Sequence, residues 1–122
     1  MLCKVSDKAF DDKDWAFEIK WDGYRAIADI NGKNTKLYSR NGLGFEAKYP
    51  QVFEAISAIK KKMVLDGEIV AFDEKGMPSF EALQGFDPMN PAPMIYYVFD
   101  ILYVNGKRVE DLPLLERKAF LK

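Results

Sequence analysis

The chain contains no histidine and a single cysteine, Cys3, among its 122 residues. Without histidine it can have neither a histidine general base nor a histidine-ligated metal ion. One cysteine cannot form an intrachain disulfide or a thiolate zinc site, and it is compatible with a reducing compartment. These absences exclude histidine acid–base catalysis and metal sites built on histidine or on several cysteines within the chain.

The chain also lacks a charge excess, because 18 basic and 19 acidic residues give a formal net charge of −1. It therefore has no overall basic field to hold nucleic acid, and any contact with a polyanion must be local. Residues 1–14 carry too many charges for a signal peptide, and no apolar run approaches the length that crosses a bilayer. We expect a single cytoplasmic domain with no membrane partner.

The pattern of apolar residues predicts an α+β fold with an antiparallel-rich sheet and helices packed outside it. Alternation and Asn-Gly turn signals predict strands over 15–21, 24–30, 35–40, 63–72 and 95–104. Helical spacing predicts helices over 50–62 and 79–84 and from residue 114 onward. We expect a proline-rich loop over 87–93, and we note that Asp66-Gly67-Glu68 interrupts the apolar run of the fourth strand. The chain stops at Lys122 inside a helical pattern, so we expect a piece of a longer protein.

The most unusual feature is the run Glu-Ile-Lys-Trp-Asp-Gly-Tyr-Arg from Glu18 to Arg25. In a strand over 15–21, alternation places Glu18, Lys20 and Asp22 on the face opposite the aromatic residues. A lysine nucleophile must lose its proton, whereas neighbouring carboxylates favour the charged ammonium. The two acids therefore do not activate Lys20 by themselves, but a divalent cation or Arg25 nearby would reverse the balance. The alternative is a ladder of ion pairs on an exposed sheet face.

Two carboxylates, Asp66 and Glu68, lie within the apolar run over 63–72. Burying them is costly unless they are ion-paired or bind a metal. Oxygen ligands of this kind suit Mg²⁺, which takes one or two carboxylates and completes its coordination with substrate phosphates. The alternative is a strand edge at which the acids are solvated.

Two further residues fit a nucleotide site. Arg40, at a strand end before the Gly42 turn, can bind a phosphate through both arms of its guanidinium or be an ordinary surface residue. The aromatic strand around Phe99 can offer a platform on which a base stacks, or it can be plain core. Together with Lys20 and Glu68, these residues are the parts needed to handle a nucleotide with magnesium.

These motifs resemble the nucleotidyltransferase (adenylation) domain of ATP-dependent DNA ligases, and most closely the ligase module of bacterial multidomain end-joining ligases. The resemblance covers nearly the whole chain, with the motifs in the family's order. It is carried by Glu18–Arg25, Ser39–Gly42, Leu65–Val70, Tyr97–Leu102 and Leu112–Arg117. It implies a nucleotidyltransferase fold of the ATP-grasp-like ligase kind, of which residues 1–122 form the N-terminal part.

The resemblance implies an ATP-dependent DNA ligase whose Lys20 attacks the α-phosphate of ATP and becomes lysyl-AMP. AMP would then pass to the 5′-phosphate of a DNA nick, where the 3′-hydroxyl displaces it. The implied nucleotide-binding residues are Glu18 at the adenine amino group, Phe99 stacked on adenine, Arg25 and Arg40 at ribose or phosphate, Glu68 at the ribose or the metal, and Ile19. The implied cofactors are ATP and Mg²⁺ or Mn²⁺. The implied partner is nicked double-stranded DNA, which the full-length protein would bind. The resemblance further implies that this protein is a monomeric DNA repair enzyme of the bacterial cytoplasm.

The family continues beyond the position of Lys122 with a further glutamate motif, a lysine-bearing motif and an oligonucleotide-binding-fold domain. Those motifs supply positive charge and a metal ligand near the α-phosphate. We therefore expect the 122 residues alone to be inactive or severely impaired in self-adenylation. Two alternatives stay open: a fragment of an RNA ligase or capping-type guanylyltransferase, and a non-catalytic nucleotide-binding module.

Overall fold

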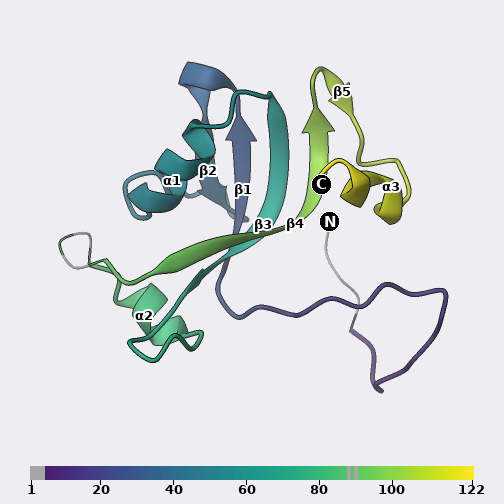
Figure 1. Ribbon diagram of the computed structural model, residues 1–122, viewed down its shortest axis with the longest axis horizontal. Coiled ribbons are helices and arrows are strands. Elements are labelled where there is room, and N and C mark those ends of the chain that lie inside the picture. The colour runs from purple at the N-terminus through teal and green to yellow at the C-terminus, as the bar shows by residue number, and fades with distance from the viewer. Residues whose placement is uncertain (1–4, 88, 90) are drawn as a thin grey trace.

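The structure, a computed structural model, describes residues 5–87, 89 and 91–122. Five strands form one antiparallel sheet in the order β2-β1-β3-β4-β5 (Figure 1). The strands are β1 Tyr24–Ile30, β2 Lys36–Ser39, β3 Met63–Ala71, β4 Met94–Val104 and β5 Lys107–Arg108. The helices are α1 Pro50–Ser57, α2 Phe80–Gln84 and α3 Leu114–Ala119, and a 3₁₀ turn at Gly32–Asn34 joins β1 to β2. The predicted α+β class with an antiparallel sheet is confirmed.

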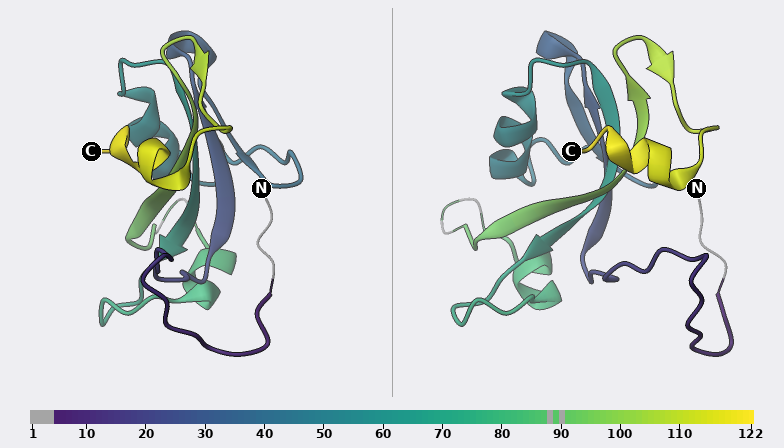
Figure 2. Two further views of the ribbon diagram at one scale, coloured as in Figure 1. Left: turned by 90° about the vertical axis from the view of Figure 1, so that its right-hand side faces the viewer. Right: turned by 45° about the vertical axis from the view of Figure 1, so that its right-hand side comes forward.

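Each helix covers a different part of the sheet. Helix α1 packs against β1 and β4, α2 packs against β3, and α3 packs against β4. Figures 1 and 2 show α1 beside the β2–β1 side of the sheet and α3 beside β4 and β5. No helix in the described ranges has the length and apolar character needed to span a bilayer.

The hydrophobic core lies between α1 and one face of the sheet. Ala26, Ala28 and Ile30 of β1 are buried on that face, and Val52 and Ile56 of α1 belong to the same cluster. The alternation of β1 therefore turns its other residues, which begin with Arg25, toward the opposite face. That face carries the candidate site.

Helix α1 is shorter than predicted. Pro50 occupies its first turn, where the fixed φ of proline is favourable. The helix ends at Ser57, before the expected end at Lys62. The carbonyl of Lys62 instead accepts a hydrogen bond from the Asn105 N–H at 2.9 Å, so the chain is already extended where it enters β3.

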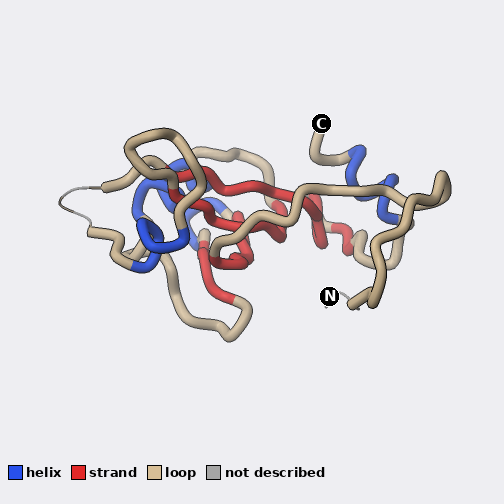
Figure 3. The backbone as a smooth tube through the Cα atoms, turned by 90° about the horizontal axis from the view of Figure 1, so that it is seen from below, coloured by secondary structure: helices blue, strands red, loops and turns tan. Residues whose placement is uncertain are grey.

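The strand predicted over 15–21 is wrong. Residues 5–23, which we call the N-terminal arm, contain no helix or strand (Figure 3). Trp15, Phe17 and Ile19 were expected to face the core, but they are 63%, 59% and 71% exposed. Phe10 packs on Trp15 and Phe17, with ring centroids 5.1 and 5.6 Å away. Alternation produces a strand only where another strand can pair with it, and no described strand pairs with the arm.

The strand predicted over 63–72 is confirmed as β3, which continues through Asp66, Gly67 and Glu68 although these residues interrupt its apolar run. A Cβ atom at Gly67 would lie 2.5 Å from the Tyr97 carbonyl oxygen and 2.6 Å from the Tyr96 ring. Glycine is therefore needed here for the close approach of β4.

Three residues of interest lie outside the described part of the chain. These are Cys3, on which the compartment argument depends, and Pro88 and Asn90 of the loop expected over 87–93.

Candidate functional site

The N-terminal arm is attached to the sheet next to Lys20. The Gly23 N–H donates a hydrogen bond to Oε1 of Glu68 on β3 at 3.2 Å. A Cβ atom at Gly23 would lie 2.1 Å from the Ile69 carbonyl oxygen, so only glycine permits this approach. Trp21 stacks on Tyr97 of β4, with ring centroids 3.9 Å apart and an interplanar angle of 11°. These contacts hold the Lys20 segment over β3 and β4.

Lys20 itself is exposed and lies within electrostatic reach of Glu68. Burial raises the pKa of Glu68, while the Gly23 N–H and the charges of Lys20 and Arg25 oppose that rise and Asp22 adds to it. The prediction that Glu18, Lys20 and Asp22 share one face of a strand is wrong, because the arm is not a strand. The local charges of Lys20 and Glu68 are nevertheless close enough to affect each other.

Arg25 and Asp66 form an ion pair across β1 and β3, in which the Asp66 carboxylate is buried and the Arg25 side chain is partly exposed. The Arg25 Nε and Nη2 atoms donate to the two Asp66 carboxylate oxygens at 2.9 and 2.6 Å. Asp66 is 2% exposed, so the alternative of a solvated strand edge is wrong for this residue. The ion pair compensates for burial of the Asp66 carboxylate, as the cost of burying a charge requires.

Phe99 reaches the same place through a β-bulge. On β3, Asp66 pairs with Asp100 and the next residue, Gly67, pairs with Val98, so Phe99 is an extra residue on β4. Bulges redirect side chains, and here the Arg25 guanidinium lies 5.6 Å from the centroid of the Phe99 ring. The structure therefore places the predicted stacking residue beside a predicted phosphate-binding residue.

Arg25, Arg40 and Glu68 line one cavity of about 450 Å³, between the start of β1, the end of β2 and β3. A second cavity of about 430 Å³ shares Arg25 and Arg40 and adds Asp66. The first cavity is also lined by Lys48, whose ammonium lies 4.9 Å from the centroid of the Tyr24 ring. Cations gathered around a cavity suit an anionic ligand such as a phosphate.

Sequence reasoning missed Lys48. It lies in an irregular segment before α1 and belongs to no recognisable periodic pattern, so nothing in the chain marks it. Only the approach of this segment to Tyr24 brings the ammonium to the cavity.

The arm has another attachment at Glu18. The Lys118 ammonium, near the end of α3, forms an ion pair with the Glu18 carboxylate and donates to the Phe99 carbonyl oxygen at 2.9 Å. Ile19, predicted to bind nucleotide, is exposed between Glu18 and Lys20. Lys118 was not among the sequence-predicted residues, because its partner Glu18 is 100 positions away.

Within the described ranges, no group of three or more Asp, Glu or Cys side chains is arranged to hold a metal ion. Asp66 is engaged by Arg25, and Glu68 accepts the Gly23 N–H. Because Mg²⁺ can bind through one protein carboxylate and the phosphates of a nucleotide, the role predicted for Glu68 stays a prediction.

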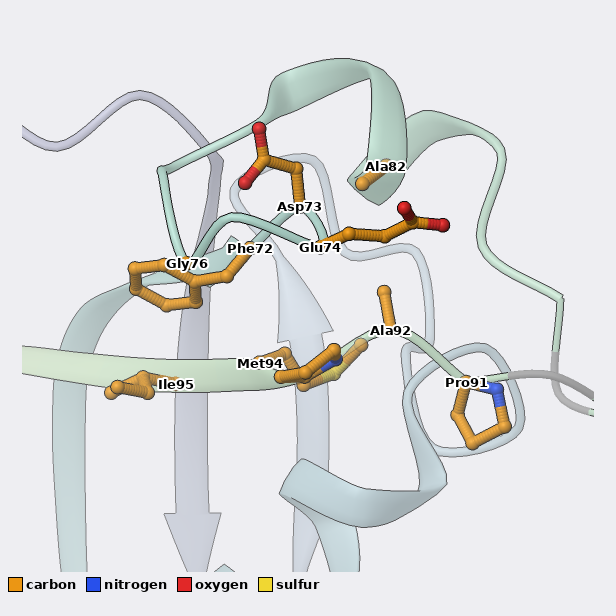
Figure 4. A pocket seen from close by; sticks show the side chains of 10 residues that line it. Phe72, Asp73, Glu74, Gly76, Ala82, Pro91, Ala92, Met94 and Ile95 are labelled. Carbon is orange, nitrogen blue, oxygen red and sulfur yellow. The ribbon is translucent and has the colours of Figure 1, made fainter.

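A larger cavity of about 810 Å³ lies away from these residues (Figure 4). It lies between the turn at 73–76, α2 and the start of β4. Among the described residues that line it, the charged ones are Asp73 and Glu74, and none is a lysine or arginine. A triphosphate would be repelled there, so size does not identify the nucleotide site.

We expect Gly23→Ala to slow any reaction of Lys20 by about 100-fold, because displacement of a reacting group by about 1 Å has effects of this size. The new Cβ would collide with the Ile69 carbonyl and push the arm off Glu68. The rate is measured by quenching the reaction at successive times and quantifying the covalent product on Lys20. Gly85→Ala is the matched control, because its Cβ meets nothing closer than 3.4 Å. An unchanged rate in Gly23→Ala would show that the contact of Gly23 with Glu68 and Ile69 does not position Lys20.

Comparisons with known proteins find DNA ligases and DNA ligase-like proteins. The family model described as "ATP dependent DNA ligase domain" matches residues 1–122. The chain is 38% identical over 112 residues to the multifunctional non-homologous end joining protein LigD of Mycolicibacterium smegmatis, an alignment covering 90% of this chain and 14% of that protein. It is 33% identical to the SPbeta prophage-derived DNA ligase-like protein LigB of Bacillus subtilis, covering 99% of this chain and 45% of that protein. The chain spans less than half the length of these curated relatives.

Solved structures show the same likeness. The crystal structure of the ligase domain from M. tuberculosis LigD matches with a TM-score of 0.75 and 31% identity, over 85% of this chain and 34% of that one. A mycobacterial DNA ligase D complexed with ATP and MES matches with a TM-score of 0.71 and 32% identity, over the same shares. The sheet described above is therefore part of the fold of that ligase domain, as the motifs predicted.

Proposed function

Since the chain belongs to the ATP-dependent DNA ligase domain family, we propose that it supplies the nucleotide-attacking part of an ATP-dependent DNA ligase. In this proposal residues 1–122 are the N-terminal part of an adenylation domain. The main observation in its support is the contact between Gly23 and β3, where the Gly23 N–H donates to Glu68. This contact holds the Lys20 segment beside a cavity lined by Arg25 and Arg40.

The proposed reaction starts when Nζ of Lys20 has lost its proton. Its lone pair attacks the α-phosphorus of ATP, a nitrogen–phosphorus bond forms, and the bond to the leaving pyrophosphate breaks. Arg25, Arg40 and Lys48 face the phosphates and neutralise their charge, which is the main task of a protein in such transfers. The AMP would then be transferred to the 5′-phosphate at a DNA nick and displaced by the 3′-hydroxyl.

The remaining predicted roles belong to the same proposal. Phe99 stacks on adenine, Glu18 accepts from its amino group, and Ile19 lies between Glu18 and the nucleophile. Glu68 binds the ribose or a Mg²⁺ or Mn²⁺ ion, which when bound would offset negative charge on the phosphates. The complete protein would act as a monomer in the cytoplasm of a bacterium.

DNA is favoured as the substrate over RNA or a capping reaction. The curated relatives LigD and LigB are named as a DNA end-joining protein and a DNA ligase-like protein. The alternative of a non-catalytic module would require a site that binds nucleotide but has no nucleophile in place. The attachment of the arm on both sides of Lys20, at Glu18 and at Gly23, argues for a positioned nucleophile.

The test is to incubate the full polypeptide that carries these residues with Mg²⁺ and ATP labelled at the α-phosphate, then digest it and locate the label. We expect an acid-labile AMP group on the peptide that contains Lys20, and less label from GTP. Sealing of a nicked duplex by the same preparation tests the DNA step. Label on another residue, or preferred labelling from GTP, would refute the assignment.

A further inference from the structure

The Lys118 side chain joins two residues that the proposed function assigns to adenine. Its ammonium is ion-paired with the Glu18 carboxylate and donates to the Phe99 carbonyl oxygen at 2.9 Å. Glu18 lies on an irregular arm, and Phe99 lies in the bulge of β4. One cation therefore sets the position of the carboxylate relative to the aromatic ring.

Lys118 is itself held in a fixed place. The preceding residue, Arg117, binds both carboxylate oxygens of Asp100, at 2.8 and 2.9 Å, and both residues are buried. Asp100 follows Phe99 directly in the chain. Consecutive residues of α3 thus bind consecutive residues of β4. These contacts hold the backbone of Lys118 in place, so that its side chain extends to Glu18 from a fixed point.

We propose that Lys118 is a positioning residue for base recognition, which orients the Glu18 carboxylate toward the edge of a base stacked on Phe99. This inference rests on the proposed function. A carboxylate only accepts hydrogen bonds, so it matches the 6-amino group of adenine and repels the 6-carbonyl oxygen of hypoxanthine or guanine. A carboxylate free to rotate would discriminate poorly, since rotation relieves the repulsion.

The exposure of the pair agrees with a role in recognition more than in stability. The side chains of Lys118 and Glu18 are 23% and 47% exposed, and ion pairs this exposed contribute little to folding. Lys118 also links α3 to the arm, and its replacement would free Glu18 from this ion pair without removing the buried Arg117–Asp100 pair.

The test compares dissociation constants for ATP and for inosine triphosphate, whose base carries a carbonyl at position 6. It uses the full polypeptide with Lys20→Ala, so that no adduct forms during the measurement. We expect Lys118→Met to lower the preference for ATP by about tenfold, the size of a lost hydrogen bond to a charged group. Lys118→Arg should retain most of the preference, and Lys122→Met, at an exposed lysine near the same end, should leave it unchanged.

A double-mutant cycle identifies the route of the effect. If Lys118 acts through Glu18, then Lys118→Met has no further effect on the preference once Glu18→Ala is present. An equal loss in both backgrounds, or no loss with Glu18 intact, overturns the positioning role. Label on Lys20 from ATP in the Lys118→Met protein, with Lys20 restored, shows that the proposed function holds even if this inference fails. Absence of label in the unmodified protein refutes both.

Discussion

Replacing Lys20 with alanine is expected to reduce the covalent AMP adduct to background while leaving the fold intact. The side chain is the proposed nucleophile, whereas Lys48, which lines the cavity, is assigned to neutralise phosphate charge. Since Lys20 is exposed, its loss should change the free energy of unfolding by no more than about 0.5 kcal/mol. The measurement pairs adduct formation from α-labelled ATP with thermal unfolding of the same sample.

Lys20→Arg distinguishes the nucleophile from the charge. Arginine keeps the positive charge but is not deprotonated in proteins, so it cannot attack phosphorus. We expect this variant to bind ATP and to form no adduct. Lys13→Ala is the matched control, because Lys13 is an exposed lysine of the same arm, and it should be labelled normally. An adduct that persists in Lys20→Arg would show that another residue is the nucleophile.

Replacing Arg117 with methionine is expected to destabilise the protein by about 3–5 kcal/mol, which is the cost of leaving a buried charge without its partner. The Asp100 carboxylate would remain buried and lose both hydrogen bonds from the guanidinium. Arg117 also donates to the Leu112 carbonyl, so the turn into α3 would lose a contact as well. Urea unfolding at neutral pH measures the change.

The double variant Arg117→Met with Asp100→Leu provides the control. It removes the orphaned charge, so it should be more stable than Arg117→Met alone, as expected when both members of a buried pair are replaced by apolar groups. If the double variant is as unstable as the single one, lost packing and not the unpaired carboxylate is responsible.

The pH dependence of stability follows from the same pair. Burial by itself would raise the pKa of Asp100, but the hydrogen bonds and charge of Arg117 and the Ile101 N–H more than offset this, and the pKa is lowered. A lowered pKa stabilises the folded protein above the ordinary aspartate pKa of about 3.9, and this contribution is lost as the pH falls below it. In Arg117→Met the unpaired Asp100 carboxylate would gain a proton readily. The difference in unfolding free energy between this variant and the unmodified protein should therefore shrink as the pH falls toward about 4. A deficit that is independent of pH would contradict this account.

Much of the architecture could be predicted from the order of residues. The strands β1 to β4 and the helices α2 and α3 lie close to their expected ranges, and α1 begins where expected, because alternation and helical spacing reflect which side chains are buried. The motifs around Lys20, Arg40 and Glu68 are local, so their resemblance to a family is visible without a structure. The exclusion of a histidine base and of histidine-ligated or thiolate metal sites within these 122 residues follows from composition alone.

The failures have a common cause. The arm alternates as a strand does, yet it is irregular, because pairing depends on a partner strand that alternation cannot reveal. Gly67 interrupts an apolar run in the sequence, and only the structure shows that it allows the close approach of β4. In each case the deciding contact comes from a residue distant in the sequence.

The sequence by itself therefore determined the family, the position of the candidate nucleophile and the kinds of side chain that accompany it. Only the tertiary structure decided how they meet: Gly23 against Glu68, Arg25 on Asp66 beside Phe99, and Lys118 on Glu18. The physical reason is that strand register, the bulge at Phe99 and the packing of α3 on β4 are long-range properties of the folded sheet. Lys20 is prominent in the sequence, but its surroundings exist only in the fold.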